Sequence, residues 1–92
     1  MTIDPNREEI LRIAAQYGAR NVRVFGSVAR GDDRADSDVD LLVEMEDSRS
    51  LLDLVGFEQD LEDLLRRDVD VLTDASIHPD LRPRITAEAR AL

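Results

Sequence analysis

Apolar positions along the chain repeat with two periods, one typical of helices and one typical of strands. Helical spacing is clearest in the second half, where Leu, Val and Phe form a long stripe. Short runs of strand-forming residues alternate with the helical segments. The order predicts an α/β fold in which helices cover a small sheet. We expect helices over residues 4–17, 51–67 and 80–91, strands over residues 22–25, 38–45 and 69–73, and one helical turn over residues 28–30.

Local signals mark several boundaries of these elements. Gly18 is placed to end the first helix in a left-handed conformation. Ser50 and Asp53 resemble a capping box at the start of the long helix. The apolar run over residues 41–43 is unbroken, which predicts a strand covered on both faces. The stripe over residues 51–65 is expected to be core, with an interface as the alternative for part of it.

Composition narrows the class of protein. We expect one domain over residues 1–92, with 21 acidic and 12 basic residues and a net charge of −9. This balance weighs against direct binding of nucleic acid and against docking on an anionic membrane. No membrane-length apolar run or signal peptide is visible, so a cytoplasmic location is expected. The absence of Cys and Lys excludes thiol chemistry, Schiff bases and a Walker-type phosphate loop.

Carboxylates gather at the second and third strands. Asp38 and Asp40 are two residues apart and would share one face of a strand. Paired like charges at an apolar strand need compensation, and oxygen ligands suit Mg²⁺ or Mn²⁺. Asp68 or Asp70 would add a third carboxylate from the next strand, so that two ions could be held. Alternation cannot choose between them; we favour Asp70 because it lies deeper in the apolar run.

A phosphate-binding element is suggested where the first strand ends. Gly26 would let the backbone approach a phosphate closely. The Ser27 hydroxyl and the N–H groups after it can donate to phosphate oxygens. Arg30 could reach the same anion through its planar guanidinium. Bound metal ions would reverse the local sign of charge, so that an acidic protein could hold a triphosphate.

Each of these features alone has an ordinary structural explanation. A Gly-Ser pair after a strand is most often a turn, and an Asp-x-Asp strand start is more often a solvated edge. Arg30 alone would be a surface charge. The order in which the features occur favours the functional interpretation: strand, Gly-Ser, loop, paired Asp on a strand, and a third Asp on another strand.

The segment from Gly26-Ser27, through ten intervening residues, to Asp38-Val39-Asp40 resembles the signature of the polymerase-beta-type nucleotidyltransferase superfamily. The fuller string, Gly-Ser-x-Ala-Arg-Gly up to Ser-Asp-x-Asp-Leu-Leu-Val, is similar to that of minimal nucleotidyltransferases. Residues 69–73 resemble the family's third-carboxylate strand, which supports Asp70. The resemblance implies a small mixed β-sheet with flanking helices. It also implies Mg²⁺-dependent transfer of a nucleoside monophosphate from a nucleoside triphosphate to a hydroxyl, with release of pyrophosphate.

The resemblance further assigns a role to each candidate residue. Asp38 and Asp40 would bind two Mg²⁺ ions. Asp70 would bind the catalytic ion and help to deprotonate the acceptor. The nucleotide, with ATP as the expected substrate, would be held or supported by Gly26, Ser27, Arg30 and Ser37.

A partner protein is the expected acceptor. Minimal members of this family are commonly encoded beside a HEPN-domain toxin of the RNase type, and the resemblance implies an antitoxin that adds AMP to a toxin tyrosine. A chain of 92 residues has only the catalytic layer, so a partner or a second copy must complete the acceptor site. The acidity would suit a basic partner. Two alternatives stay open, an antitoxin that acts by occlusion alone and transfer to a small molecule; so do the oligomeric state and the preferred nucleobase.

Overall fold

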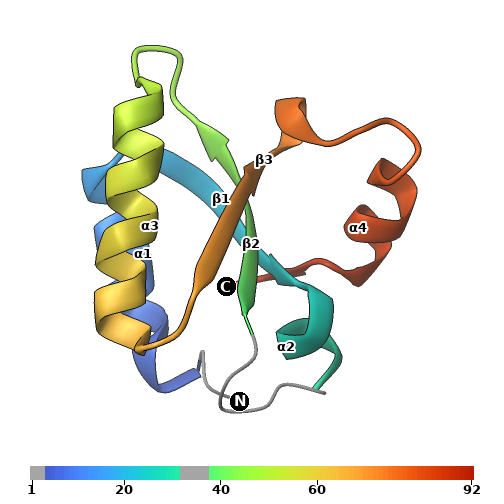
Figure 1. The fold of residues 1–92 in the computed structure, drawn as a ribbon, viewed down its shortest axis with the longest axis horizontal. Coiled ribbons are helices and arrows are strands. Elements are labelled where there is room, and N and C mark those ends of the chain that lie inside the picture. The colour runs from blue at the N-terminus through green and yellow to red at the C-terminus, as the bar shows by residue number, and fades with distance from the viewer. Residues whose placement is uncertain (1–3, 32–37) are drawn as a thin grey trace.

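A computed structural model of the chain describes residues 4–31 and 38–92. A single four-stranded sheet, with strand order β3-β2-β1-β4, lies between two layers of helices (Figure 1). The elements in chain order are η1 (Asp4–Asn6), α1 (Arg7–Gln16), β1 (Ala19–Phe25), α2 (Gly26–Arg30), β2 (Val39–Met45), α3 (Leu51–Leu65), β3 (Val69–Thr73), η2 (Asp74–Ser76), α4 (Arg82–Glu88) and β4 (Arg90–Ala91).

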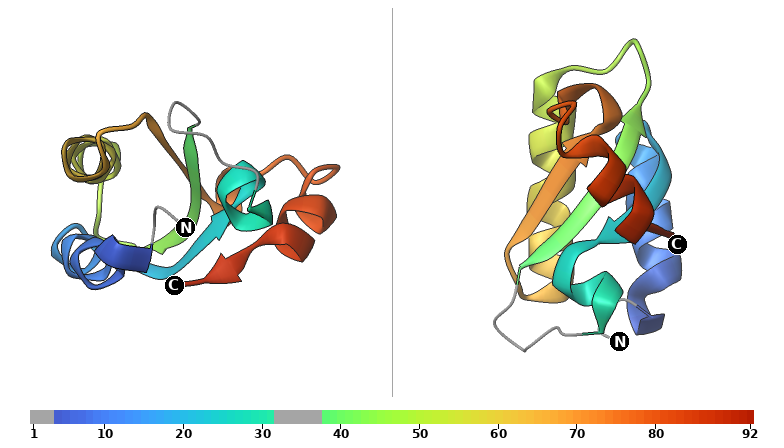
Figure 2. Two further views of the ribbon diagram at one scale, coloured as in Figure 1. Left: turned by 90° about the horizontal axis from the view of Figure 1, so that it is seen from below. Right: turned by 90° about the vertical axis from the view of Figure 1, so that its right-hand side faces the viewer.

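The sheet is mixed, as expected. Strand β2 pairs antiparallel with β1 and parallel with β3, and β4 pairs antiparallel with β1. Helices α1 and α3 cover one face of the sheet, and α2 and α4 lie on the other (Figure 2). None of the described helices is long and apolar enough to cross a membrane.

Strand β2 is the centre of the fold. Leu41, Leu42 and Val43 are completely buried, which confirms a strand covered on both faces. Leu41 and Val43 belong to the main core beneath α1 and α3. Leu42 belongs to a smaller cluster with Phe25 and Ile77 on the opposite face. The alternation of side chains along β2 therefore divides the apolar interior into two unequal parts.

The predicted first helix is a 3₁₀ turn followed by α1, and Gly18 ends it with a φ of 77° as expected. Strand β1 then begins at Ala19, three residues earlier than predicted. Ala19 is paired with Met45 of β2, and the register shifts between Arg20 and Arg23. This long-range pairing gives strand structure to residues whose local pattern does not predict it.

Helix α3 is capped as predicted, because the Ser50 N–H donates to the Asp53 carboxylate at 2.9 Å. Its buried side chains are Phe57, Leu61 and Leu65. The prediction that the whole stripe is core is wrong at its start, where Leu51 and Val55 are exposed. The first turn of α3 projects past the ends of the strands, so the sheet does not cover it (Figure 1). The helix ends at Leu65 rather than at residue 67.

The last predicted helix, over residues 80–91, is wrong at both ends. Helix α4 covers only Arg82–Glu88, and Ala89 is extended with ψ of 136°. The chain then pairs with β1 through β4, and the Leu92 N–H donates to the Val22 carbonyl oxygen at 3.0 Å. Backbone hydrogen bonds to the edge of β1 replace those that further helical turns would have made.

Candidate active site

Gly26 brings the end of β1 against the start of β2. Antiparallel pairing places Phe25 opposite Asp40, so the next residue along the chain lies beside the Asp40 side chain. Gly26 has a φ of 73°, which favours glycine. A β-carbon at this position would overlap Oδ2 of Asp40. Two features therefore require glycine at this position: its backbone conformation and its close approach to a carboxylate.

Parallel pairing then places Asp70 of β3 directly in register with Asp40. Paired strands lie about 4.8 Å apart, so these two carboxylates are neighbours. Asp68 precedes β3, and its carbonyl oxygen accepts from the Val39 N–H at 2.9 Å. Asp38 lies just before β2 and is exposed. The register thus puts Asp70, rather than Asp68, beside Asp40, while the chemical role of Asp70 stays a prediction.

The pKa of Asp40 responds to the charges of three other candidate residues. Burial raises the pKa of Asp40, and the charges of Asp70 and then Asp38 raise it further, whereas Arg30 lowers it. Within residues 4–31 and 38–92, no three His, Cys, Asp or Glu side chains are close enough together to hold a metal ion. The oxygen donors nevertheless fit Mg²⁺, and their mutual repulsion is what a bound divalent cation would remove.

The predicted nucleotide-binding residues lie in and around α2. Ser27 is half-buried in its first turn, and Arg30 is its last residue. Nη1 of Arg30 lies 3.3 Å from both carboxylate oxygens of Glu88, on α4. Arg30 therefore joins α2 to α4, its neighbour in the same helical layer. Ser37 lies outside the described residues.

Two acidic residues near the site have no signal in the sequence. Glu88 of α4 pairs with Arg30, and Glu58 of α3 lies close enough to Asp70 for their charges to interact. Burial raises the pKa of Glu58 first, and Asp70 and Glu62 raise it further. Both residues come from helices that only the folded chain brings to the strands, so their spacing from the motif carries no information.

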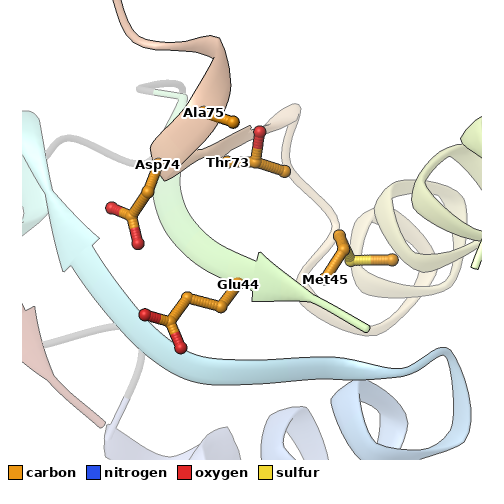
Figure 3. Close-up of a pocket in the computed structure, with 5 residues that line it drawn as sticks. All are labelled: Glu44, Met45, Thr73, Asp74 and Ala75. Atoms are coloured by element: carbon orange, nitrogen blue, oxygen red, sulfur yellow. The ribbon is translucent and has the colours of Figure 1, made fainter. Parts of the chain in front are cut away.

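A cavity of about 300 Å³ lies elsewhere, at the far ends of β2 and β3, and its lining includes Glu44, Met45, Thr73 and Asp74. Figure 3 shows the carboxylates of Glu44 and Asp74 pointing to one side and Met45 and Thr73 to the other. None of the predicted site residues lines this cavity. The carboxylates that carry the candidate chemistry instead meet at the opposite end of the two strands.

Comparisons with known proteins identify the family of the chain. Residues 7–92 match the nucleotidyltransferase domain family. A protein of Methanocaldococcus jannaschii, named as a candidate protein adenylyltransferase, is 44% identical over 89 residues, which are 97% of this chain and 96% of that protein. A protein adenylyltransferase of Thermococcus cleftensis is 38% identical over 73 residues, covering 79% of this chain and 74% of the relative.

Solved structures share the fold. The structure of a minimal nucleotidyltransferase is 46% identical, with a TM-score of 0.89 that covers 99% of this chain and 93% of the other. A chain in the complex of a tri-AMPylated Shewanella oneidensis HEPN toxin with its MNT antitoxin has a TM-score of 0.73 at 19% identity, covering 99% and 71%. That second likeness concerns the fold alone. The family match and the close relatives show that the chain belongs to the nucleotidyltransferase domain family, as a minimal nucleotidyltransferase of the protein adenylyltransferase type.

Proposed function

We propose that this protein transfers AMP from ATP to a tyrosine hydroxyl of a HEPN-domain toxin and thereby acts as its antitoxin. The observation that carries the proposal is the position of Asp40, which lies against Gly26 on one side and in register with Asp70 on the other. The candidate phosphate loop and the carboxylate pair therefore meet at one point, although twelve residues or more separate them in the chain.

The reaction needs a nucleophile, a leaving group and a destination for one proton. The tyrosine oxygen would attack the α-phosphorus of ATP, and the bond from that phosphorus to the oxygen bridging to the β-phosphate would break. AMP then stays on the tyrosine and pyrophosphate leaves. The Asp70 carboxylate would accept the tyrosine proton as the oxygen–phosphorus bond forms.

The nucleotide is an anion that an acidic protein must attract. Mg²⁺, held by Asp38, Asp40 and Asp70, would supply positive charge to the phosphates and stabilise charge that develops during transfer. Gly26 would admit the triphosphate close to the backbone, and Ser27 would donate to its oxygens. The Arg30 guanidinium, close enough to influence Asp40, would add a second cation.

The acceptor is inferred from the relatives and from the described fold. The related Thermococcus protein is a protein adenylyltransferase, and the structurally similar Shewanella complex contains an AMPylated HEPN toxin. The described strands form one four-stranded sheet, and the candidate carboxylates lie at the ends of two of them. A protein acceptor supplies its own binding surface, whereas a small molecule would need one built for it.

Label transfer tests the proposal. The chain is mixed with Mg²⁺, ATP labelled at the α-phosphate and the HEPN-domain protein of the same genome, beside an Asp38→Asn/Asp40→Asn double variant. We expect label on a tyrosine of the HEPN protein with the wild type alone. A stable complex without label would contradict the proposal and favour neutralisation by occlusion.

A further inference from the structure

The acidic charge of the chain is concentrated on one segment. Residues 44–65, which include all of α3, contain eight Asp and Glu residues but only one basic residue, Arg49. Arg49 is already engaged with acids of the same segment, 3.3 Å from Glu46 and 3.8 Å from Asp53. Most of the net charge of −9 therefore comes from this segment, chiefly from α3 and the loop before it.

The same helix carries three exposed large apolar side chains, among them the two most exposed of the described residues. Leu51 is 73% exposed, Leu52 is 81% exposed and Val55 is 40% exposed. Residues three and four apart on a helix are neighbours, so Val55 lies beside both leucines. A single exposed leucine is ordinary, but three neighbouring apolar side chains that contribute little to the core form a contact surface. The remainder of α3 is held by buried residues further along, so this surface is not needed to fix the helix.

This surface continues toward the candidate active site. Glu58 lies one turn beyond Val55 on α3, and Glu62 lies one turn beyond Glu58. The Glu58 carboxyl interacts with the charge of Asp70, and Glu62 accepts a hydrogen bond from the Val69 N–H at 3.1 Å. The helix thus runs along the outer edge of β3, from an apolar end to the carboxylates of the site (Figure 1).

We infer that α3 is the docking surface for the acceptor protein, with Leu51, Leu52 and Val55 at its apolar centre and the acidic residues of α3 and of the loop before it around them. The partner would present an apolar patch bordered by Lys and Arg, because an apolar centre within a charged, complementary rim is typical of specific interfaces. A second copy of this chain fits poorly, since it would bring the same acidic segment to the contact. This inference rests on the proposed function and adds where its acceptor binds.

Two exposed leucines make a direct test, since replacing them removes little from the core. The purified Leu51→Ser/Leu52→Ser variant is titrated with the HEPN-domain protein of the same genome in a calorimeter. Leu81→Ser is the matched control, because Leu81 is 51% exposed but lies before α4 in the other helical layer. We expect the double variant to weaken Kd by at least about 10-fold, as for residues at the centre of an interface, and the control to leave it unchanged. Equal Kd values for the two variants and the wild type would overturn the inference.

Three further measurements distinguish a loss of docking from a loss of folding or of catalysis. Circular dichroism should show an unchanged Tm for the double variant, and AMP transfer should show a raised KM for the partner with an unchanged kcat. Added salt should weaken wild-type binding, because it screens the charges across the interface. Binding that does not change with salt would overturn the role of the acidic residues in docking. If wild type binds but never transfers AMP, the proposed function fails, while the affinity loss still tests docking. A wild-type dimer that the double variant separates, with unchanged toxin affinity, would overturn the inference in favour of self-association.

Discussion

The two faces of the sheet differ in what they bury. Beneath α1 and α3, the face is filled with apolar side chains from both helices and from three strands. Among the described residues, the opposite face carries a smaller buried cluster of Phe25, Leu42 and Ile77, and an ion pair at 2.9 Å between Arg23 and Asp74 lies near it. The face that carries Asp40 is therefore the weaker contributor to stability. One face of the sheet therefore holds most of the buried core, and the other face carries the candidate catalytic carboxylate.

Alternation along the strands produces this division. In β2, residues 39, 41 and 43 enter the main core, while Asp40 and Leu42 lie on the other face. Asp70 follows the same rule in β3, between the buried Val69 and Val71. Each acid is thus held in place by apolar neighbours on the far side of its own strand, and substitutions on the two faces should have different consequences.

The largest effect is expected at Asp40. Asp40→Asn removes a carboxylate from the centre of the site and should lower AMP transfer by about 1,000-fold, the upper range for loss of one preorganised polar group. Its Tm without metal should be unchanged or higher, because repulsion from Asp38 and Asp70 is relieved. Transfer is measured with labelled ATP and Tm by circular dichroism. A sharp fall in Tm would show that Asp40 belongs to the fold instead.

The opposite face should respond in the opposite way. Leu61→Ala removes a fully buried side chain from α3 and should lower the free energy of unfolding by about 3 kcal/mol. Urea titration measures this loss, and transfer is then compared at equal amounts of folded protein. Specific activity should stay at the wild-type level. A loss of activity in fully folded Leu61→Ala would mean that the two faces are coupled.

Two glycines allow the contact with Asp40 to be tested separately from stability, because they share one backbone conformation. Gly26 and Gly31 have φ values of 73° and 79°, so alanine at either should cost about 1–2 kcal/mol of stability. Only the Gly26→Ala side chain would meet Asp40, since nothing lies within 4 Å of the corresponding position at Gly31. We expect both variants to lose similar stability, measured in urea, but only Gly26→Ala to lose transfer. Equal activity in the two would disprove the importance of the Gly26–Asp40 contact.

The smallest effect is expected from pH. Asp40 has a pKa raised above its ordinary value of 3.8, so its protonated form favours the folded state. Its contribution to stability is fully present below 3.8 and is lost as pH rises through the raised pKa. The stability of wild type should therefore fall relative to Asp40→Asn across this interval, as followed by urea titration at several pH values. A constant difference between the two proteins would contradict the raised pKa.

Much of the site could be predicted because its signals are local. Asp40 and Asp70 interrupt apolar runs, and Gly26 follows a strand directly, so each residue stands out from its immediate neighbours in the sequence. Their contact depends on two strand registers, antiparallel for β1 with β2 and parallel for β2 with β3, which no short window of sequence contains. The sequence could therefore name these residues but could not show that Gly26 touches Asp40.

The errors in the predicted fold arise where packing between residues distant in the sequence determines the local structure. β4 consists of two residues, Arg90 and Ala91, and forms only because β1 offers a free edge. Leu51 fits the apolar period of α3, yet the first turn of that helix extends past the sheet. Periodicity shows which side of a helix is apolar, but it does not show how far the neighbouring element reaches.

We propose that the parallel register between β2 and β3 builds the transfer site. Asp70→Asn and Asp68→Asn test it, because the two residues are only two positions apart in the chain and Asp70 alone is in register with Asp40. Transfer of labelled AMP to the HEPN-domain protein is measured for both variants beside wild type. We predict that Asp70→Asn loses transfer and Asp68→Asn retains it. Loss in Asp68→Asn with retention in Asp70→Asn would contradict the account.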